Sequence, residues 1–320
     1  MTTQPNVIQQ AEHSAWPSLP LAAWADSYAT LHMLTQIVGK TRLGLAPMQN
    51  HWWQVTLYVT ERGLTTSSMP YGEHVATVAF DFIDHNVTVG TSAGQRRSIP
   101  LIQRPVREFY LEYLDVLQAL GINVRIHGVP VEIETAIPFA EDTQHASYDA
   151  DAVNAWWRIM VQVDRVLKVF RGRFEGKSSP VHFFWGSFDM AATRFSGRSA
   201  PLFTGSVPNC PDYVMQEAYS RECSSAGFWP GSGNQEAAFY SYAYPEPPGY
   251  SNHAVRPEAA YYDTTLHEFL LPYAAVRASK SPDQVLLDFF ESTYAAAADL
   301  AIWDRASLER HDQSMRASHG

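Results

Sequence analysis

The sequence predicts an α+β protein made of two similar halves, each a mainly antiparallel sheet flanked by helices. Helical periodicity alternates along the chain with short runs rich in aromatic and β-branched residues, which is typical of mixed helix and strand. The same order of elements occurs twice in the 320 residues. We therefore expect an internal duplication, with one half over residues 16–140 and the other over 141–310.

The first half opens with a helix. From Trp24 to Val38 apolar residues recur at helical spacing, while polar residues stand at intervals of four on another side of the helix. These polar residues are His32, Gln36 and Lys40. Because residues four apart lie one above the other on a helix, we expect the three side chains in one row.

Strands and one more helix follow in the first half. The aromatic and β-branched segment 51–60 predicts a strand that His51 opens. Residues 84–86, Asp-His-Asn, are of types that favour a turn, and they separate two shorter β-like runs. We expect the remaining elements of this half as strands at 75–83, 87–89 and 122–126 and a helix from Pro105 to Gly121.

The second half repeats this order. A helix is expected over 152–173, capped by Asp149 or Asp151, and a strand that His182 opens is expected over 182–188. A strand at 239–244 and a helix at 282–303 complete the half. The segment 207–248 is rich in Gly, Ser, Pro and Tyr, so we expect an insertion that forms a lid or a binding loop.

The spacing of the two aromatic strands supports the duplication. His51 and His182 are 131 residues apart, and so are Pro70 and Pro201. Two diverged copies would pair about a pseudo-two-fold axis and share one core. The alternative is coincidence, because a helix followed by an aromatic strand is a common arrangement.

Composition excludes several classes of function. The net charge of −10 and the absence of a dense basic run argue against nucleic acid as a partner. The two cysteines have no ligand-like spacing, and no run approaches the roughly 18 apolar residues of a membrane span. Residues 1–15 are polar and resemble no secretion signal, so we expect a mobile leader there, a mobile tail at 311–320 and a cytoplasmic protein.

The motifs of common enzyme classes are absent from the sequence. It contains no phosphate-binding loop, dinucleotide fingerprint, His-Glu-x-x-His pair or Gly-x-Ser-x-Gly elbow. The glycine-rich segment 227–233 is interrupted by Phe, Trp and Pro and is followed by no basic residue, so it predicts a structured turn. Function therefore has to be inferred from scattered residues.

The catalytic candidates are His51, His182 and Glu222. A duplicated fold would bring the two histidines toward a central cleft, where imidazoles act as acid and base. If a divalent metal is bound, His32, His51 and His182 are its expected ligands. The alternative is that His51 and His182 cap their strands, that His32 is a buried core histidine, and that Glu222 in the 207–248 segment contacts a ligand.

Basic and aromatic residues supply candidates for ligand binding. Basic residues are few, and Lys40, Lys177 and Arg194 stand where they can clamp a carboxylate or phosphate. Helix-dipole compensation and solvation are the alternative explanation. Trp53 and Trp185 lie on the expected aromatic strands, and Trp229 lies in the expected loop; all three can line a pocket or fill the core.

Several long strings resemble one bacterial family. They include NHWWQVTLYVTERGLTT, GKSSPVHFFWGSFDMAATRFSGR, SSAGFWPG and FYSYAYPEP. Together they are similar to the family catalogued as domain of unknown function 5996, over about Trp16 to Glu309. The resemblance implies a stand-alone bacterial cytoplasmic protein, and it implies no activity, cofactor or catalytic residue.

These observations lead to two expectations for function. The first is an enzyme that acts on a small anionic or aromatic metabolite in a cleft between the halves, through histidine acid–base chemistry or a histidine-bound metal. The second is a non-catalytic protein that binds a small molecule in an aromatic pocket. Both take a small molecule as partner, without nucleic acid or membrane.

Overall fold

The computed structural model describes residues 15–310 and divides into two compact units. Unit 1 contains residues 15–162, 183–188 and 206–211, and unit 2 contains the other described residues. Both units combine helices with antiparallel sheet, so the α+β prediction is confirmed. The boundary falls inside a helix near residue 162 and not near residue 140. The predicted leader and tail lie outside the described residues, apart from residue 15.

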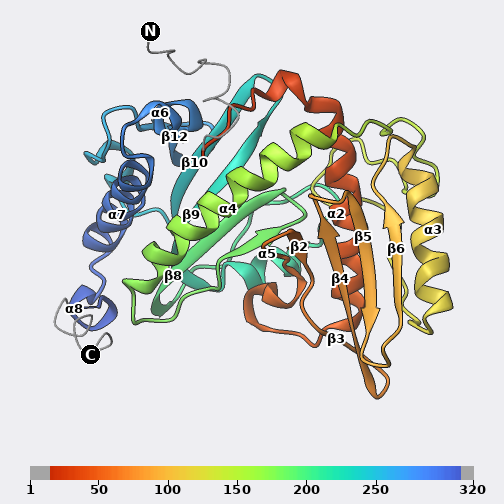
Figure 1. Cartoon of the computed structure of the whole chain (residues 1–320). Helices are drawn as coiled ribbons and strands as arrows, with labels where there is room; N and C mark the ends of the chain where they lie inside the picture. Colours follow the sequence, from red (N-terminus) through yellow and green to blue (C-terminus); the bar gives the residue numbers. More distant parts are fainter. Residues whose placement is uncertain (1–14, 311–320) are drawn as a thin grey trace, which may run out of the picture. The chain divides into compact units, whose positions relative to one another are not determined.

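Unit 1 holds a six-stranded sheet in which every recorded neighbour pair is antiparallel (Figure 1). Its order is β1-β2-β4-β5-β6, and β3 pairs with β4. The strands are β1 (Tyr58–Val59), β2 (Gly63–Thr65), β3 (Met69–Tyr71), β4 (His74–Asp81), β5 (Asn86–Thr91) and β6 (Arg96–Pro100). The predicted strands near 75–83 and 87–89 and the turn between them are confirmed, and the strand predicted at 122–126 is absent.

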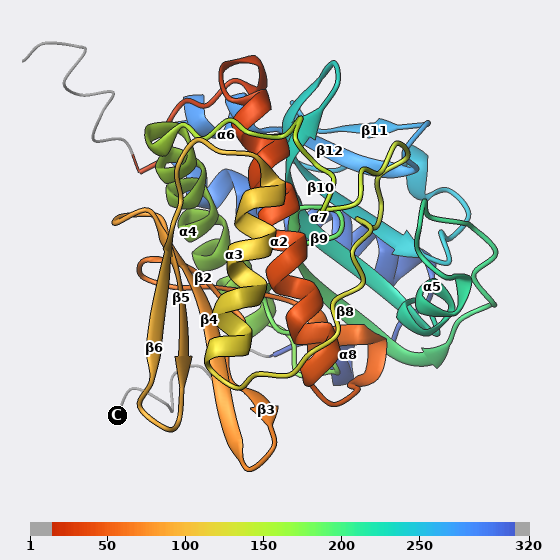
Figure 2. The ribbon, with the colours of Figure 1, turned by 90° about the vertical axis from the view of Figure 1, so that its right-hand side faces the viewer.

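The helices of unit 1 agree with the predicted periodicity. Helices α2 (Ala25–Leu45) and α3 (Val106–Ala119) lie side by side (Figure 2). Gly121, where the helix was expected to end, follows the C-cap residue Leu120 of α3 and has a φ of 72°, a conformation that favours glycine. Helix α4 (Ala150–Gly172) begins in unit 1, where the Asp149 carboxylate accepts a hydrogen bond of 3.0 Å from the Ala152 amide. The predicted cap is confirmed.

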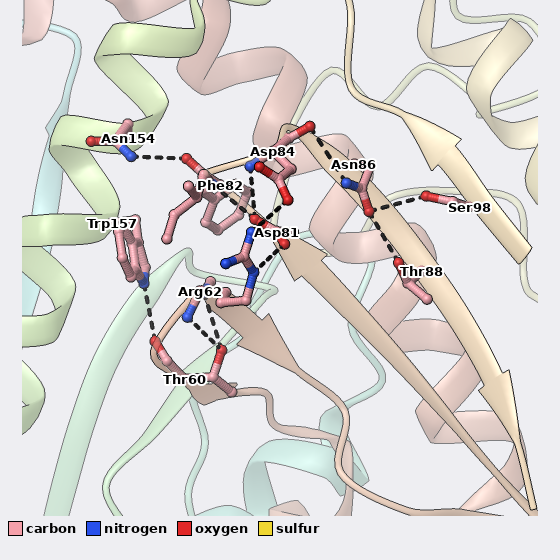
Figure 3. Close-up of polar contacts among 12 residues, drawn as sticks. Thr60, Arg62, Asp81, Phe82, Asp84, Asn86, Thr88, Ser98, Asn154 and Trp157 are labelled. Carbon is pink, nitrogen blue, oxygen red and sulfur yellow. Dashed lines mark hydrogen bonds and ion pairs between the residues drawn. The ribbon is translucent and has the colours of Figure 1, made fainter. Parts of the chain in front are cut away.

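Polar contacts attach the start of α4 to the ends of the strands (Figure 3). The Asn154 side chain donates to the Phe82 carbonyl at 2.9 Å, and the Trp157 indole donates to the Thr60 carbonyl at 3.2 Å. Beside them Arg62 pairs with Asp81 at 2.5 Å and with Asp84 at 2.6 Å. The Asn154 and Trp157 bonds satisfy backbone carbonyl groups that lie just beyond the ends of the strands.

The prediction that His51 opens a strand is wrong. Residues Asn50–Val55 form the short helix η2, which follows the 3-10 segment η1 (Leu21–Ala23) and α2 in the chain. Within η2, His51 and Trp52 are in the left-handed region at φ values of 58° and 61°. The Arg42 side chain of α2 donates to the Gln54 carbonyl at 2.6 Å. This contact stabilises a compact turn that strand propensity alone does not favour.

Unit 2 holds the second sheet, of order β11-β12-β10-β9-β8-β7 (Figure 1). Its strands are β7 (His182–Phe184), which spans residues of both units, β8 (Asp189–Ser199), β9 (Arg221–Ser232), β10 (Gln235–Tyr244), β11 (Tyr261–Asp263) and β12 (Glu268–Pro272). The helices are α5 (Asp212–Ala218), η3 (Tyr250–Asn252), α6 (Tyr273–Ala278), α7 (Pro282–Leu300) and α8 (Arg305–Leu308). The predicted strand at 239–244 and helix at 282–303 are confirmed.

Two expectations about the second half need correction. The segment 207–248 contains β9 and β10, which are central strands of the sheet and not a lid. Strand β9 was missed because its Ser, Ala and Gly residues have low β-propensity. The duplication is not confirmed, because the two sheets differ in strand order and His182 begins a strand where His51 occupies a left-handed turn.

Candidate active site

The sheet of unit 2 has an apolar face and a polar face. Side chains alternate along each strand, and on one face Phe228 and Phe239 pack with Tyr273 and Phe290 of the covering helices. The strand register places the side chains that alternate with these on the opposite face. We name this opposite surface the polar sheet face, and its residues are Asp189, Thr193, Ser225, Gly227, Tyr240, Tyr242 and Glu268.

Gly227 allows a tyrosine to cross this face. It pairs with Ala191 on one side and with Tyr240 on the other. A Cβ atom at Gly227 would lie 2.4 Å from the Tyr240 hydroxyl oxygen and 2.3 Å from the Met190 carbonyl oxygen. The missing side chain therefore lets the Tyr240 ring lie across β9.

The Tyr240 hydroxyl donates a hydrogen bond to the Asp189 carboxylate. Both residues are 8% exposed. Burial raises the pKa of Tyr240 well above its usual value, and the nearby Asp189 charge raises it further. The tyrosine therefore stays protonated and acts as a fixed donor to a buried carboxylate.

More hydroxyl groups lie beside this pair. The Tyr242 hydroxyl is 3.0 Å from the Tyr219 hydroxyl, and the Thr193 and Ser225 hydroxyls are 2.9 Å apart. The rings of Tyr240 and Tyr242 stack with centroids 6.1 Å apart. Hydroxyl groups that both donate and accept give this face hydrogen-bonding capacity without positive charge.

Glu268 adds a second carboxyl group. Tyr240 pairs with Leu270, so Glu268, two residues before Leu270 on β12, is on the Tyr240 side of the sheet. Its side chain is half-buried. Burial raises the pKa of Glu268 to about 8, and the negative charges of Asp189 and Asp263 contribute to this shift. At neutral pH this carboxyl group is mostly protonated and can donate a proton.

The other unit 2 residues predicted from the sequence do not gather at one point. Arg194 lies on the apolar face, where its guanidinium is 3.2 Å from Glu291 and stacks on Phe170 at 3.5 Å, so it has an internal partner in place of a ligand. Glu222 pairs with Arg198 at 2.7 Å. The remaining unit 2 candidates differ in exposure: His182 is buried, Trp229 is half-buried and Lys177 is exposed. Their predicted roles stay predictions.

In unit 1, His32 fixes a turn of the backbone. Its Nε2 atom lies 3.0 Å from the Trp185 carbonyl oxygen and 2.8 Å from the Gly186 carbonyl oxygen, so this nitrogen acts as a donor. Burial lowers the pKa of His32 to about 4, and the imidazole is therefore neutral. His51 is also buried, with its ring 5.1 Å from that of Trp53.

The three histidines do not form a metal centre. Within residues 15–310, no group of three or more His, Cys, Asp or Glu side chains is placed to hold a metal ion. The Nε2 atom of His32 is also engaged by two carbonyl groups, which removes it as a metal ligand. The expectation of a site made of His32, His51 and His182 is therefore wrong. The acid–base roles of His51 and His182 stay predictions.

The comparisons with known proteins identify a family. The model of a family of unknown function, DUF5996, matches residues 16–310. The chain belongs to this family. The resemblance seen in the sequence is thereby confirmed. The searches of curated proteins and of solved structures found no match. Among the described helices, none has the length and apolar character needed to cross a bilayer.

The sequence contained part of the signal for the polar sheet face. Tyrosines at 240, 242 and 244 alternate in a β-like run, which places their side chains on one face. Asp189 is visible only as an acid that follows an aromatic segment. Glu268 carries no local signal at all, because the pairing of β12 with β10 joins segments far apart in the sequence.

Proposed function

We propose that the chain is an enzyme that transfers a proton to or from a small organic molecule at the polar sheet face of unit 2. One observation carries the proposal. A half-buried Glu268, whose pKa of about 8 keeps it protonated at neutral pH, lies on the same sheet face as an Asp189 carboxylate that accepts a hydrogen bond from Tyr240. Two carboxyl groups in different protonation states are a usual arrangement for general acid–base catalysis.

Each residue of this group has a defined role. Glu268 is the acid that gives its proton to the substrate and takes it back at the end of a cycle. The charge of Asp189 raises the pKa of Glu268. The Tyr240 hydroxyl donates to the Asp189 carboxylate and holds it in position. Asp189 and Tyr240 therefore set the pKa of Glu268, and Glu268 is the residue that contacts the substrate.

The chemistry of this face favours an uncharged substrate. Asp189 is a carboxylate, and the other polar residues of the face carry neutral carboxyl or hydroxyl groups, so an anion would be repelled. Tyrosine, serine and threonine hydroxyls suit a substrate that bears hydroxyl or carbonyl groups. A small neutral hydroxy or carbonyl compound fits this face better than the anionic metabolite expected from the sequence.

Replacing Glu268 by glutamine tests the proposal. The protein is incubated with a cellular metabolite extract, and mass spectrometry follows which metabolites are consumed. We expect the wild type to convert at least one neutral metabolite and Glu268→Gln to convert it about 10²–10⁴ times more slowly, since glutamine cannot donate a proton in this way. Glu258→Gln, at an exposed position of the same unit, is the matched control and should keep the full rate.

A binding protein is the second candidate function. The stacked Tyr240 and Tyr242 rings and the hydroxyl groups beside them also suit a receptor for a small polar molecule. Recovery of an unchanged metabolite with the wild type, with no turnover in the extract, would favour this function. A full rate of turnover in Glu268→Gln would contradict the acid role.

A further inference from the structure

Lys40 is a buried cation without a partner. It belongs to helix α2 in unit 1 and is 3% exposed. Within residues 15–310, the structure gives its ammonium group no hydrogen bond and no ion pair. Buried charges in folded proteins are nearly always paired, because removing a charge from water is costly. The Lys40 nitrogen is not among the fully buried polar atoms of the described residues, so it keeps contact with solvent and a small anion can reach it.

The neighbours of Lys40 on the same row of α2 are fully engaged. His32 donates to the carbonyl groups of Trp185 and Gly186. The Gln36 amide donates to the Val131 carbonyl at 2.8 Å and accepts from the Val131 amide at 2.9 Å. Both residues thus hold backbone segments against the helix. Lys40, one turn further along the same row, makes no such bond.

A tryptophan ring lies beside the ammonium group. The Lys40 nitrogen is 5.8 Å from the centre of the Trp185 ring. The Trp185 indole donates to the Val55 carbonyl at 2.7 Å, and a Cβ atom at Gly39 would lie 2.2 Å from this ring. The ring is therefore fixed in place, and it offers the ammonium group a cation–π contact but no negative charge.

The segment that carries Cys210 is tied to the same part of unit 1. The Glu132 amide, next to Val131, donates to the Pro208 carbonyl at 2.8 Å. Burial lowers the pKa of Lys40 to about 8, and the nearby Cys210 side chain acts in the opposite direction. No carboxylate contributes to this shift. An added anion would supply the missing charge.

We propose that Lys40 is the anion-binding residue of a separate site in unit 1, which takes the carboxylate of a small organic acid. A single lysine matches one negative charge, whereas a phosphate dianion needs several donors or an arginine fork. The guanidinium of Arg42 is directed elsewhere, because its Nε atom donates to the Gln54 carbonyl at 2.6 Å and its central carbon lies 5.2 Å from the centre of the Tyr58 ring. This inference does not depend on the polar sheet face of unit 2.

The test measures the binding of acetate and of benzoate by isothermal titration calorimetry, against sodium chloride at equal ionic strength. We expect the wild type to bind at least one of the two carboxylates, and Lys40→Met to bind it at least about tenfold more weakly. Lys280→Met removes an exposed lysine and should bind as the wild type does. Methionine fills a similar volume without charge, so Lys40→Met should also unfold at a higher temperature than the wild type in the absence of the anion.

A second measurement uses the four lysines of the chain. In protein labelled with [ε-13C]lysine, a bound carboxylate should raise the pKa of Lys40, because an adjacent negative charge favours the ammonium form. Equal binding by Lys40→Met and the wild type overturns the proposal. So does the absence of binding of either acid to the wild type at tens of millimolar.

Discussion

Replacing Gly227 by alanine is expected to destabilise the protein by about 3 kcal/mol, because the new methyl group has no space. The Cβ atom would lie 2.3 Å from the Met190 carbonyl oxygen and 2.4 Å from the Tyr240 hydroxyl oxygen. The first of these atoms belongs to the backbone of β8, so relief requires a shift between strands. The same shift moves Tyr240 away from Asp189.

Gly90→Ala is the matched control for this substitution. Gly90 also lies within a strand, β5, and a Cβ atom there meets nothing within 4 Å. The free energy of unfolding, measured with urea and followed by tryptophan fluorescence, should therefore change by less than about 1 kcal/mol in Gly90→Ala. Similar losses in the two variants would mean that β9 does not need the glycine.

The second large effect is expected at Arg194, whose replacement by leucine should cost about 3–5 kcal/mol. The guanidinium is 1% exposed and lies between Phe170 at 3.5 Å and Tyr294 at 4.3 Å. It donates to the Phe170 carbonyl and pairs with Glu291. Leucine fills part of this volume but leaves the Phe170 carbonyl and the Glu291 carboxylate without these donors.

Arg198→Leu provides the comparison, since Arg198 also pairs with a glutamate but its side chain is 48% exposed. Exposed ion pairs contribute little, so this variant should lose at most about 1 kcal/mol in the same urea experiment. A loss at Arg194 no larger than that at Arg198 would show that the buried guanidinium is not part of the core. It would also restore Arg194 as a candidate for ligand binding.

Patterns within single segments predicted much of the fold. The long helices and strands β4 and β5 follow from periodicity and from Asp149 and Gly121 at their ends. Strand β9 did not follow, because the glycine at 227 is required by the Met190 carbonyl of β8 and the Tyr240 ring of β10. Propensity describes one segment at a time and carries no information about such neighbours.

The candidate residues divide in the same way. The polar row of α2 was visible from its spacing, and the structure confirms the alternative that His32 is a buried histidine; the burial of Lys40 was not predicted. The catalytic expectation for His51 rested on an equivalence with His182 that the strand assignment does not support. Asp189 and Glu268 come from strands that are not neighbours in the sheet, so no local pattern brings them together.

The pH dependence of stability follows from the state of Glu268. Its pKa rises from an unfolded value near 4.5 to about 8 in the folded protein. The folded state therefore holds a proton that the unfolded state releases in this interval, and the free energy of unfolding falls as the pH rises from about 4.5 to about 8. Glu268→Gln should remove this part of the decline.

The pKa of Glu268 itself is the most direct test of the proposed acid. Protein labelled with 13C at the glutamate carboxyl groups is titrated by NMR, and the Glu268 signal is assigned by its absence from the Glu268→Gln spectrum. The account predicts a midpoint near pH 8 in the wild type. A midpoint near the usual 4.5 would mean that Glu268 is ionised at neutral pH, and it would contradict its role as the proton donor.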